Sequence, residues 1–382
     1  MLTNFCLLPS VIKELGTINA IDGRDRLKNI ERFFNKTCLI LHVPEGDKND
    51  GNHHRSGYGF WWEVGKLEQT SPQVSKCVQT LLKKFLQSGR FRYSPIPDFE
   101  TWPKLISDRC QLFEYLDLVL ISNEDRERFG LDKDTVSLQI FELGNLEIVA
   151  LGNLLSSKLF EKIDTILDKG VNGGDSVETF WNEILHPFIR QSNEVCISDK
   201  HCLAPSSIAE EVDNKYYVDW KRGTCQLLKR INTTKIHNKL DVTIVSGWNL
   251  QHGSRNICPS DYQCLLKKML ADLGCGCIKR IKLFVVDGFH YNRDHERRIL
   301  FLYKPRPPLG YIELSDSMNA FKITPDGNFS RHFMFSYFGT IEEARRQEKF
   351  LENAKSVAKI CLLGEYLPND QEWKISAPCE IH

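Results

Sequence analysis

The chain has 382 residues, of which 41% are hydrophobic and 26% charged, and its 50 basic and 50 acidic side chains cancel. These values are ordinary for a soluble protein with a packed core, and they exclude a collagen-like, disordered or supercharged chain. No apolar run approaches the roughly 18 residues that span a bilayer, and the N-terminus lacks the basic segment of a signal peptide. The 13 cysteines are an odd, scattered set. We therefore expect a cytoplasmic protein with reduced thiols and no membrane span.

The length suggests two or three domains of roughly 100–200 residues each. Glycines cluster in residues 169–175, and this composition predicts a linker and a domain boundary there. Before that boundary, hydrophobic patterns predict strand 38–43, helix 74–86, strand 116–121, a hairpin of strands 135–141 and 146–151, and helix 154–167. Residues 1–170 are thus expected to form an α/β domain of unclear topology.

After the boundary, strands and helices alternate more regularly. The predicted elements are a helix from about residue 177, strand 194–199, helix 224–231, strand 240–246, helix 262–273, and strands 281–286 and 299–303. This succession predicts crossover connections and a largely parallel sheet with helices on its faces. We expect residues 175–382 to form this second α/β domain, ending in a helical extension.

The residues most suggestive of chemistry lie between 281 and 319. His295 and Arg297 are two residues apart, so in extended backbone their side chains leave the same face of a strand. Arginine can clamp phosphate oxygens with two hydrogen bonds, while histidine can attack phosphorus or transfer a proton. Residues 279–306 also hold eight basic and three acidic side chains. This pattern predicts a phosphate site.

His295-Glu296-Arg297, the apolar strand after it and Ser317-Met318-Asn319 resemble one half-site of the phospholipase D superfamily. Residues 180–184 and 195–199 resemble the opening of a branch related to the C-terminal domain of MIT-domain proteins, which also occurs in prokaryotic conflict and anti-phage systems. The resemblance covers about residues 176–340 and implies a phospholipase D-like sheet with flanking helices. It implies catalytic roles for His295, Arg297, Ser317 and Asn319, phosphate binding by Arg293 and Arg297, and an orienting role for Asp199.

The resemblance implies a nucleic-acid-binding protein of a prokaryotic defence system, acting with partner proteins of its operon. Phosphodiester cleavage without a metal is the activity of complete superfamily sites. Here, however, the superfamily lysine is Arg297, its aspartate falls at Leu302, and only one such motif is present. Two alternatives follow: a homodimer completes a nuclease site, or the chain is a non-catalytic module that binds a partner protein or a phospholipid headgroup.

Other candidate sites are weaker. His53 and His54 are adjacent, so their side chains diverge, and a solvated loop is the favoured interpretation. The spacing of Cys258, Cys264, Cys275 and Cys277 matches no CxxC zinc pair. The aromatic run at Tyr58, Phe60, Trp61 and Trp62 could stack nucleic-acid bases, although packing in a core is more common. No glycine-rich phosphate loop is present. The sequence therefore predicts neither a metal nor a cofactor.

Overall fold

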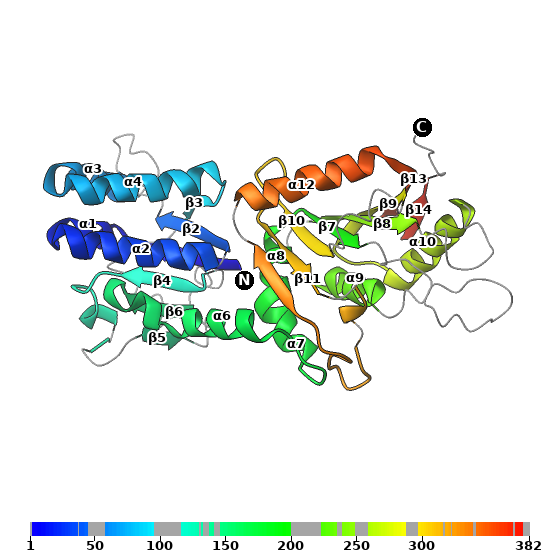
Figure 1. Ribbon diagram of the computed structural model, residues 1–382, viewed down its shortest axis with the longest axis horizontal. Helices are drawn as coiled ribbons and strands as arrows, with labels where there is room; N and C mark the ends of the chain where they lie inside the picture. Colours follow the sequence, from blue (N-terminus) through cyan, green and yellow to red (C-terminus); the bar gives the residue numbers. More distant parts are fainter. Residues whose placement is uncertain are drawn as a thin grey trace. The chain divides into compact units, whose positions relative to one another are not determined.

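The computed structural model describes residues 2–36, 38–44, 58–94, 116–129, 131–132, 137–140, 146–199, 223–234, 239–248, 259–287, 297–315, 318–321, 323–338, 341–369 and 371–376. The chain divides into two compact units, Leu2–Asp168 and Lys169–His382. Each unit is a mixed β-sheet flanked by helices (Figure 1). No helix in the described ranges is both long and apolar enough to cross a membrane.

The first unit contains a six-stranded sheet in the order β3-β2-β1-β4-β6-β5. Its strands are β1 (Leu2–Leu7), β2 (Cys38–Pro44), β3 (Phe91–Ser94), β4 (Leu118–Ile121), β5 (Ser137–Ile140) and β6 (Leu146–Ala150). The neighbouring helices are α1 (Pro9–Thr17), α2 (Ala20–Lys36), α3 (Tyr58–Thr70), α4 (Pro72–Gln87) and α6 (Lys158–Lys169). All strands are parallel except β5, which forms the predicted antiparallel pair with β6.

The centre of the first sheet is a strand that the sequence did not reveal. β1 lies between β2 and β4, and the strand order reverses direction at the β1–β4 pair. In doubly wound sheets such a reversal opens a crevice at the carboxyl ends of the strands. Here Glu14 of α1 joins the segments that follow these two strands, because its carboxylate accepts hydrogen bonds of 2.6 Å from both the backbone and the side-chain amide of Asn123.

The second unit contains an eight-stranded sheet in the order β12-β11-β10-β7-β8-β9-β13-β14. The strands are β7 (Glu194–Asp199), β8 (Leu240–Trp248), β9 (Ile278–Asp287), β10 (Arg298–Leu302), β11 (Gly310–Leu314), β12 (Phe335–Phe338), β13 (Ala358–Leu367) and β14 (Glu372–Ile375). Only β7, β8 and β9 run parallel to one another. The prediction of a largely parallel sheet is therefore wrong, because the strands added on both sides pair antiparallel.

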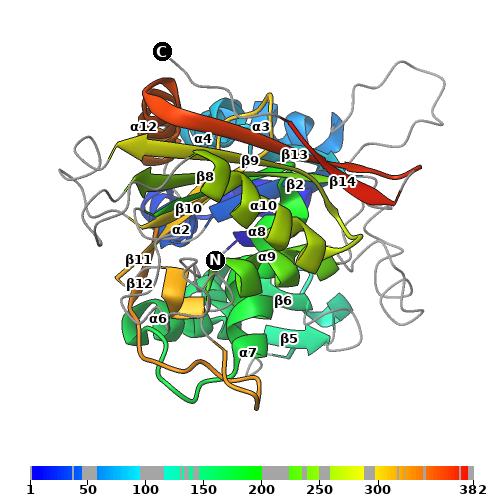
Figure 2. The same cartoon turned by 90° about the vertical axis from the view of Figure 1, so that its right-hand side faces the viewer.

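The helices of the second unit are α7 (Val177–Phe180), α8 (His186–Gln191), α9 (Thr224–Thr233), α10 (Pro259–Leu273) and α12 (Ile341–Ser356). Figure 2 shows α12 on one side of the sheet and α8, α9 and α10 on the other. Cys196 and Leu300 pack with Ala344 of α12. On the opposite face, the ring of Phe188 from α8 stacks on Phe301 with centroids 4.6 Å apart. Alternating residues of each strand thus fill two separate cores.

Two boundary predictions need correction. Within the described residues, no helical extension follows the sheet, because α12 leads into β13, which pairs along β9 as a full member of the sheet. The glycine segment 169–175 is not a free linker either. Val171 and Ser176 form antiparallel bridges with Phe333 and Asn328, so this segment belongs to the second unit. Gly170 has a φ of 66°, and a Cβ there would lie 2.6 Å from the sulfur of Met334.

Candidate functional site

Two fully buried polar residues lie side by side where β7 and β8 approach their carboxyl ends. Asp199 pairs with Ser246 in the parallel ladder, so both side chains leave the same face of the sheet. The Ser246 hydroxyl has no hydrogen-bond partner within the described ranges. A buried hydroxyl without a hydrogen-bond partner costs free energy of folding, and a role in ligand binding is one explanation for such a group in a native protein. Sequence reasoning missed Ser246, although it ends the predicted strand 240–246 just as Asp199 ends strand 194–199.

The carboxylate of Asp199 binds a distant segment of the chain. Its Oδ2 accepts a hydrogen bond of 2.6 Å from the backbone N–H of Met318. Met318 opens the 3₁₀ turn η8 (Met318–Phe321), and it stands between the predicted site residues Ser317 and Asn319. The turn η8, which contains the predicted site residue Asn319, is therefore held at the carboxyl end of β7.

Arg297 approaches the same end of the sheet from the neighbouring strand. Arg298 opposes Ser198 in the antiparallel β10–β7 ladder, so the preceding Arg297 lies at the level of Asp199 and shares its face. The main-chain oxygen of Arg297 accepts a hydrogen bond of 2.8 Å from Leu314, and its Nη1 donates one of 2.5 Å to the carbonyl oxygen of Ser315. These bonds fix the guanidinium near the start of the turn.

Arg298 faces the opposite side of the sheet, as the alternation of strand side chains predicts. It is only 6% exposed, and its guanidinium donates a hydrogen bond to Gln347 of α12. The same group lies 5.6 Å from the ring centroid of Tyr311 and 6.0 Å from that of Phe350. Arg298 is thus a packing residue of the α12 core, and only Arg297 of this pair is available at the candidate site.

Two other basic residues of segment 279–306 that the structure describes, Arg280 and Lys304, lie away from Arg297. Arg280 binds the carboxylate of Asp241 through two of its nitrogens at 2.5–3.1 Å. Lys304 pairs with Glu194 at 2.9 Å. Glu194 begins β7 and Asp241 lies near the start of β8, so these cations occupy the amino ends of the strands. The charge count that supported a phosphate site therefore overstates the positive charge near Arg297.

Several predicted site residues lie outside the described residues. These are His295, Arg293 and Ser317, together with His53, His54 and Cys258. Asn319 has its backbone in η8, and its side chain is not described. Leu302, which stands where the superfamily has aspartate, is 1% exposed and packs in the core beside Cys196 and Tyr311. An ionised carboxylate at this place would be desolvated among apolar groups.

The described part of the site combines one cation, one buried carboxylate and one unpartnered hydroxyl. Asp199 orients the turn, while Arg297 and Ser246 can donate hydrogen bonds to an oxyanion. Across the described ranges, no group of three His, Cys, Asp or Glu side chains is arranged to hold a metal ion. No protein-family model matches the chain, and no curated protein is significantly similar to it.

Proposed function

We propose that the second unit has a phospholipase D-like fold and binds the phosphate groups of nucleic acid at the carboxyl ends of β7 and β8. The observation that carries this proposal is the hydrogen bond from Met318 to Asp199. It holds Met318, which stands between the predicted site residues Ser317 and Asn319 in the sequence, at the end of β7. Arg297 approaches the same place from β10.

The physical requirements for phosphate binding support the proposal. Arg297 has five N–H donors in a planar fork, and only one of its nitrogens donates to Ser315. The other donors can bind two oxygens of a phosphate in parallel. Because the whole chain has no net charge, affinity has to come from this local arrangement rather than from long-range attraction.

The test is binding of a fluorescent single-stranded oligonucleotide, measured by polarisation at several salt concentrations. We expect affinity to fall steeply with salt, because phosphate contacts release counterions. Arg297→Gln should weaken binding by about tenfold. It should also reduce the slope of log affinity against log salt concentration by about one, the value for a single phosphate contact. The matched control is Arg306→Gln, an exposed arginine beyond the other end of β10, which should bind as the parent does. Equal losses in the two variants would leave only a diffuse basic surface.

The buried Leu302 favours binding without cleavage by a single chain, since no acid stands in the position that supports the superfamily histidine. Cleavage would need a second copy that supplies another His295. We propose a place in a prokaryotic defence system on the resemblance alone. Binding to anionic vesicles with no binding to the oligonucleotide would instead favour the headgroup-binding alternative.

A further inference from the structure

A turn of π-helix interrupts the helical segment that precedes β7. It covers Trp181–Leu185, between α7 and α8, and the N–H of His186 donates to the carbonyl of Trp181 five residues earlier. The π turn contains about one residue more than an α-helical turn. His186 rather than Leu185 therefore lies one turn after Trp181 on the same side of the helix. Single π turns of this kind are frequent at functional sites. Here the turn directs Trp181, Asn182 and His186 towards one cavity.

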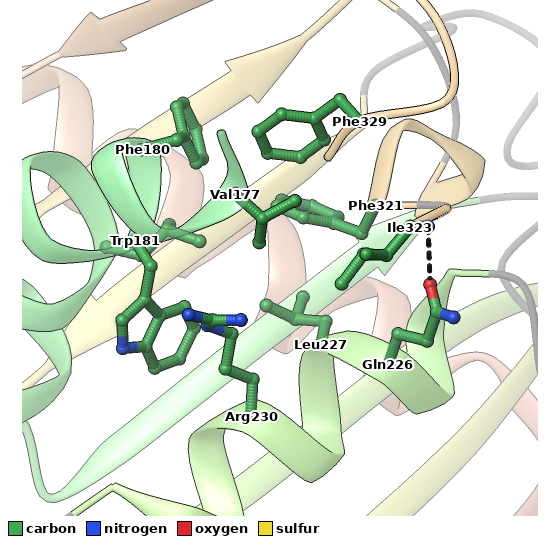
Figure 3. A pocket seen from close by; sticks show the side chains of 10 residues that line it. Val177, Phe180, Trp181, Gln226, Leu227, Arg230, Phe321, Ile323 and Phe329 are labelled. Carbon is green, nitrogen blue, oxygen red and sulfur yellow. Dashed lines mark hydrogen bonds between the residues drawn. The ribbon is translucent and has the colours of Figure 1, made fainter. Parts of the chain in front are cut away.

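This cavity has a volume of about 440 Å³ and lies between the π turn and the last turn of α9. Its lining is polar, and consists of Glu178, Trp181, Asn182, His186, Arg230, Thr233 and Thr234. A narrow apolar crevice shares Trp181 and Arg230 with it (Figure 3). None of these residues belongs to the phosphate site proposed above.

Arg230 is the main cation of the cavity. Its guanidinium lies 5.2 Å from the ring centroid of Trp181, which fixes its plane, as Figure 3 shows. It forms an ion pair with Glu178, whose side chain is 66% exposed against 23% for Arg230. Its Nε is buried and has no hydrogen-bond partner among the residues described. An ion pair with so exposed a carboxylate contributes little, so another anion can replace Glu178.

The carbonyl end of α9 would normally repel an anion. Here the hydroxyls of Thr233 and Thr234 both donate to the carbonyl oxygen of Arg230, at 3.1 and 2.8 Å. These two bonds satisfy one of the carbonyls in the last turn of α9. Burial and the nearby charge of Arg190 lower the pKa of His186, so that its ring is a neutral donor or acceptor at pH 7.

We infer that this cavity is a binding site for a small oxyanion, a phosphate or a carboxylate, held by Arg230 with Asn182 and His186 as further donors. A bound oxyanion would take the place of Glu178 at Nη2, the guanidinium nitrogen that pairs with this exposed carboxylate. The inference does not depend on nucleic-acid binding at Arg297.

Isothermal titration calorimetry with inorganic phosphate and, separately, with sodium acetate tests the site at constant ionic strength. Binding of either anion identifies the class of ligand. Arg230→Gln should weaken this binding at least tenfold, and Asn182→Ala, at an exposed position, about threefold. Glu178→Gln should strengthen it, because the variant removes the competing carboxylate.

The Glu178→Gln variant separates a ligand site from a purely structural ion pair. A structural pair predicts some loss of stability and no gain in anion affinity, and that result would overturn the inference. Failure of both anions to bind the parent protein would overturn it as well. Arg297→Gln should leave phosphate binding at Arg230 intact. If Arg297→Gln abolishes phosphate binding and Arg230→Gln does not, the inference falls while the proposed function survives.

Discussion

The carboxylate of Asp199 and the backbone N–H of Met318 form a hydrogen bond of 2.6 Å between residues 119 positions apart in the sequence. Asp199 is fully buried at the end of β7, where a carboxylate without partners would be strongly unfavourable. The bond therefore both satisfies the acid and fixes η8, the turn that contains Asn319.

Asp199→Ala should lower the free energy of unfolding by about 1–3 kcal/mol, because it leaves the Met318 N–H without its acceptor. Asp199→Asn retains an acceptor oxygen of the same size and should lose less. Chemical denaturation gives the stabilities, and oligonucleotide binding should weaken in the same order. If the alanine variant keeps both stability and affinity, Asp199 does not position the turn.

Arg297 and Arg298 should respond to substitution in opposite ways. Arg298→Met should lower the free energy of unfolding by about 2–3 kcal/mol, since it removes a charged hydrogen bond to Gln347 and ring contacts within the α12 core. Arg297→Gln should change stability by less than about 1 kcal/mol and act on binding instead. Thermal and urea unfolding of the two variants, measured together, check this division. Arg298→Ala is for the same reason no control for phosphate binding.

Local patterns predicted most elements of the fold. The apolar repeat over residues 74–86 forms α4, with Val74, Val78 and Phe85 buried, and the strand patterns at 194–199 and 240–246 form β7 and β8. The direction of strand pairing was not predictable, because it depends on contacts between distant segments. The sequence did not predict β1, because its short apolar run at the start of the chain has no strand-specific flanking signal and ends at Pro9.

The candidate site was predictable in part. Strand alternation predicts opposite faces for Arg297 and Arg298, and the predicted strand end at Asp199 accepts a hydrogen bond from Met318, next to the predicted Asn319. A count of basic residues along the chain could not show at which end of a strand each of them lies. Arg297 and Lys304, seven positions apart, flank β10 at its opposite ends, so Lys304 pairs with Glu194 while Arg297 donates a hydrogen bond to Ser315.

Cleavage of a phosphodiester remains a prediction that His295 can test. If two copies complete a superfamily site, nuclease activity should persist in EDTA and rise with the square of protein concentration below the dimer dissociation constant. His295→Ala should abolish it without changing the unfolding transition. Mixing parent and variant chains provides the control, because mixed dimers retain one histidine only. Activity that survives the substitution, or a chain that light scattering shows to be monomeric while still cleaving, would contradict a composite site.

The ion pair of Glu194 and Lys304 should make stability depend on pH. Burial alone would raise the pKa of Glu194, but hydrogen bonds from Lys304 and from Thr243, at 2.9 and 2.8 Å, outweigh it and lower the pKa below its ordinary value. A carboxyl group with a lowered folded-state pKa stabilises the fold above its unfolded pKa of about 4.3. That stabilisation is lost as the pH falls through the folded pKa.

Lys304→Met removes one of the two hydrogen bonds that lower the pKa of Glu194, and burial then opposes only Thr243 and the charge of Lys355, so the folded pKa of Glu194 should rise. We expect the variant to be less stable than the parent at pH 7 by about 1–2 kcal/mol, a modest value because Lys304 is nearly half exposed. The difference in free energy of unfolding between parent and variant should shrink towards pH 4. There Glu194 becomes protonated in the variant, and a neutral carboxyl group is not stabilised by the charge of Lys304. Urea unfolding of both proteins at pH 4, 5.5 and 7 measures this difference, with Arg306→Met as the control for loss of a neighbouring positive charge. A deficit that stays constant over this range would mean that Lys304 stabilises the fold through its packing and not through the charge of Glu194.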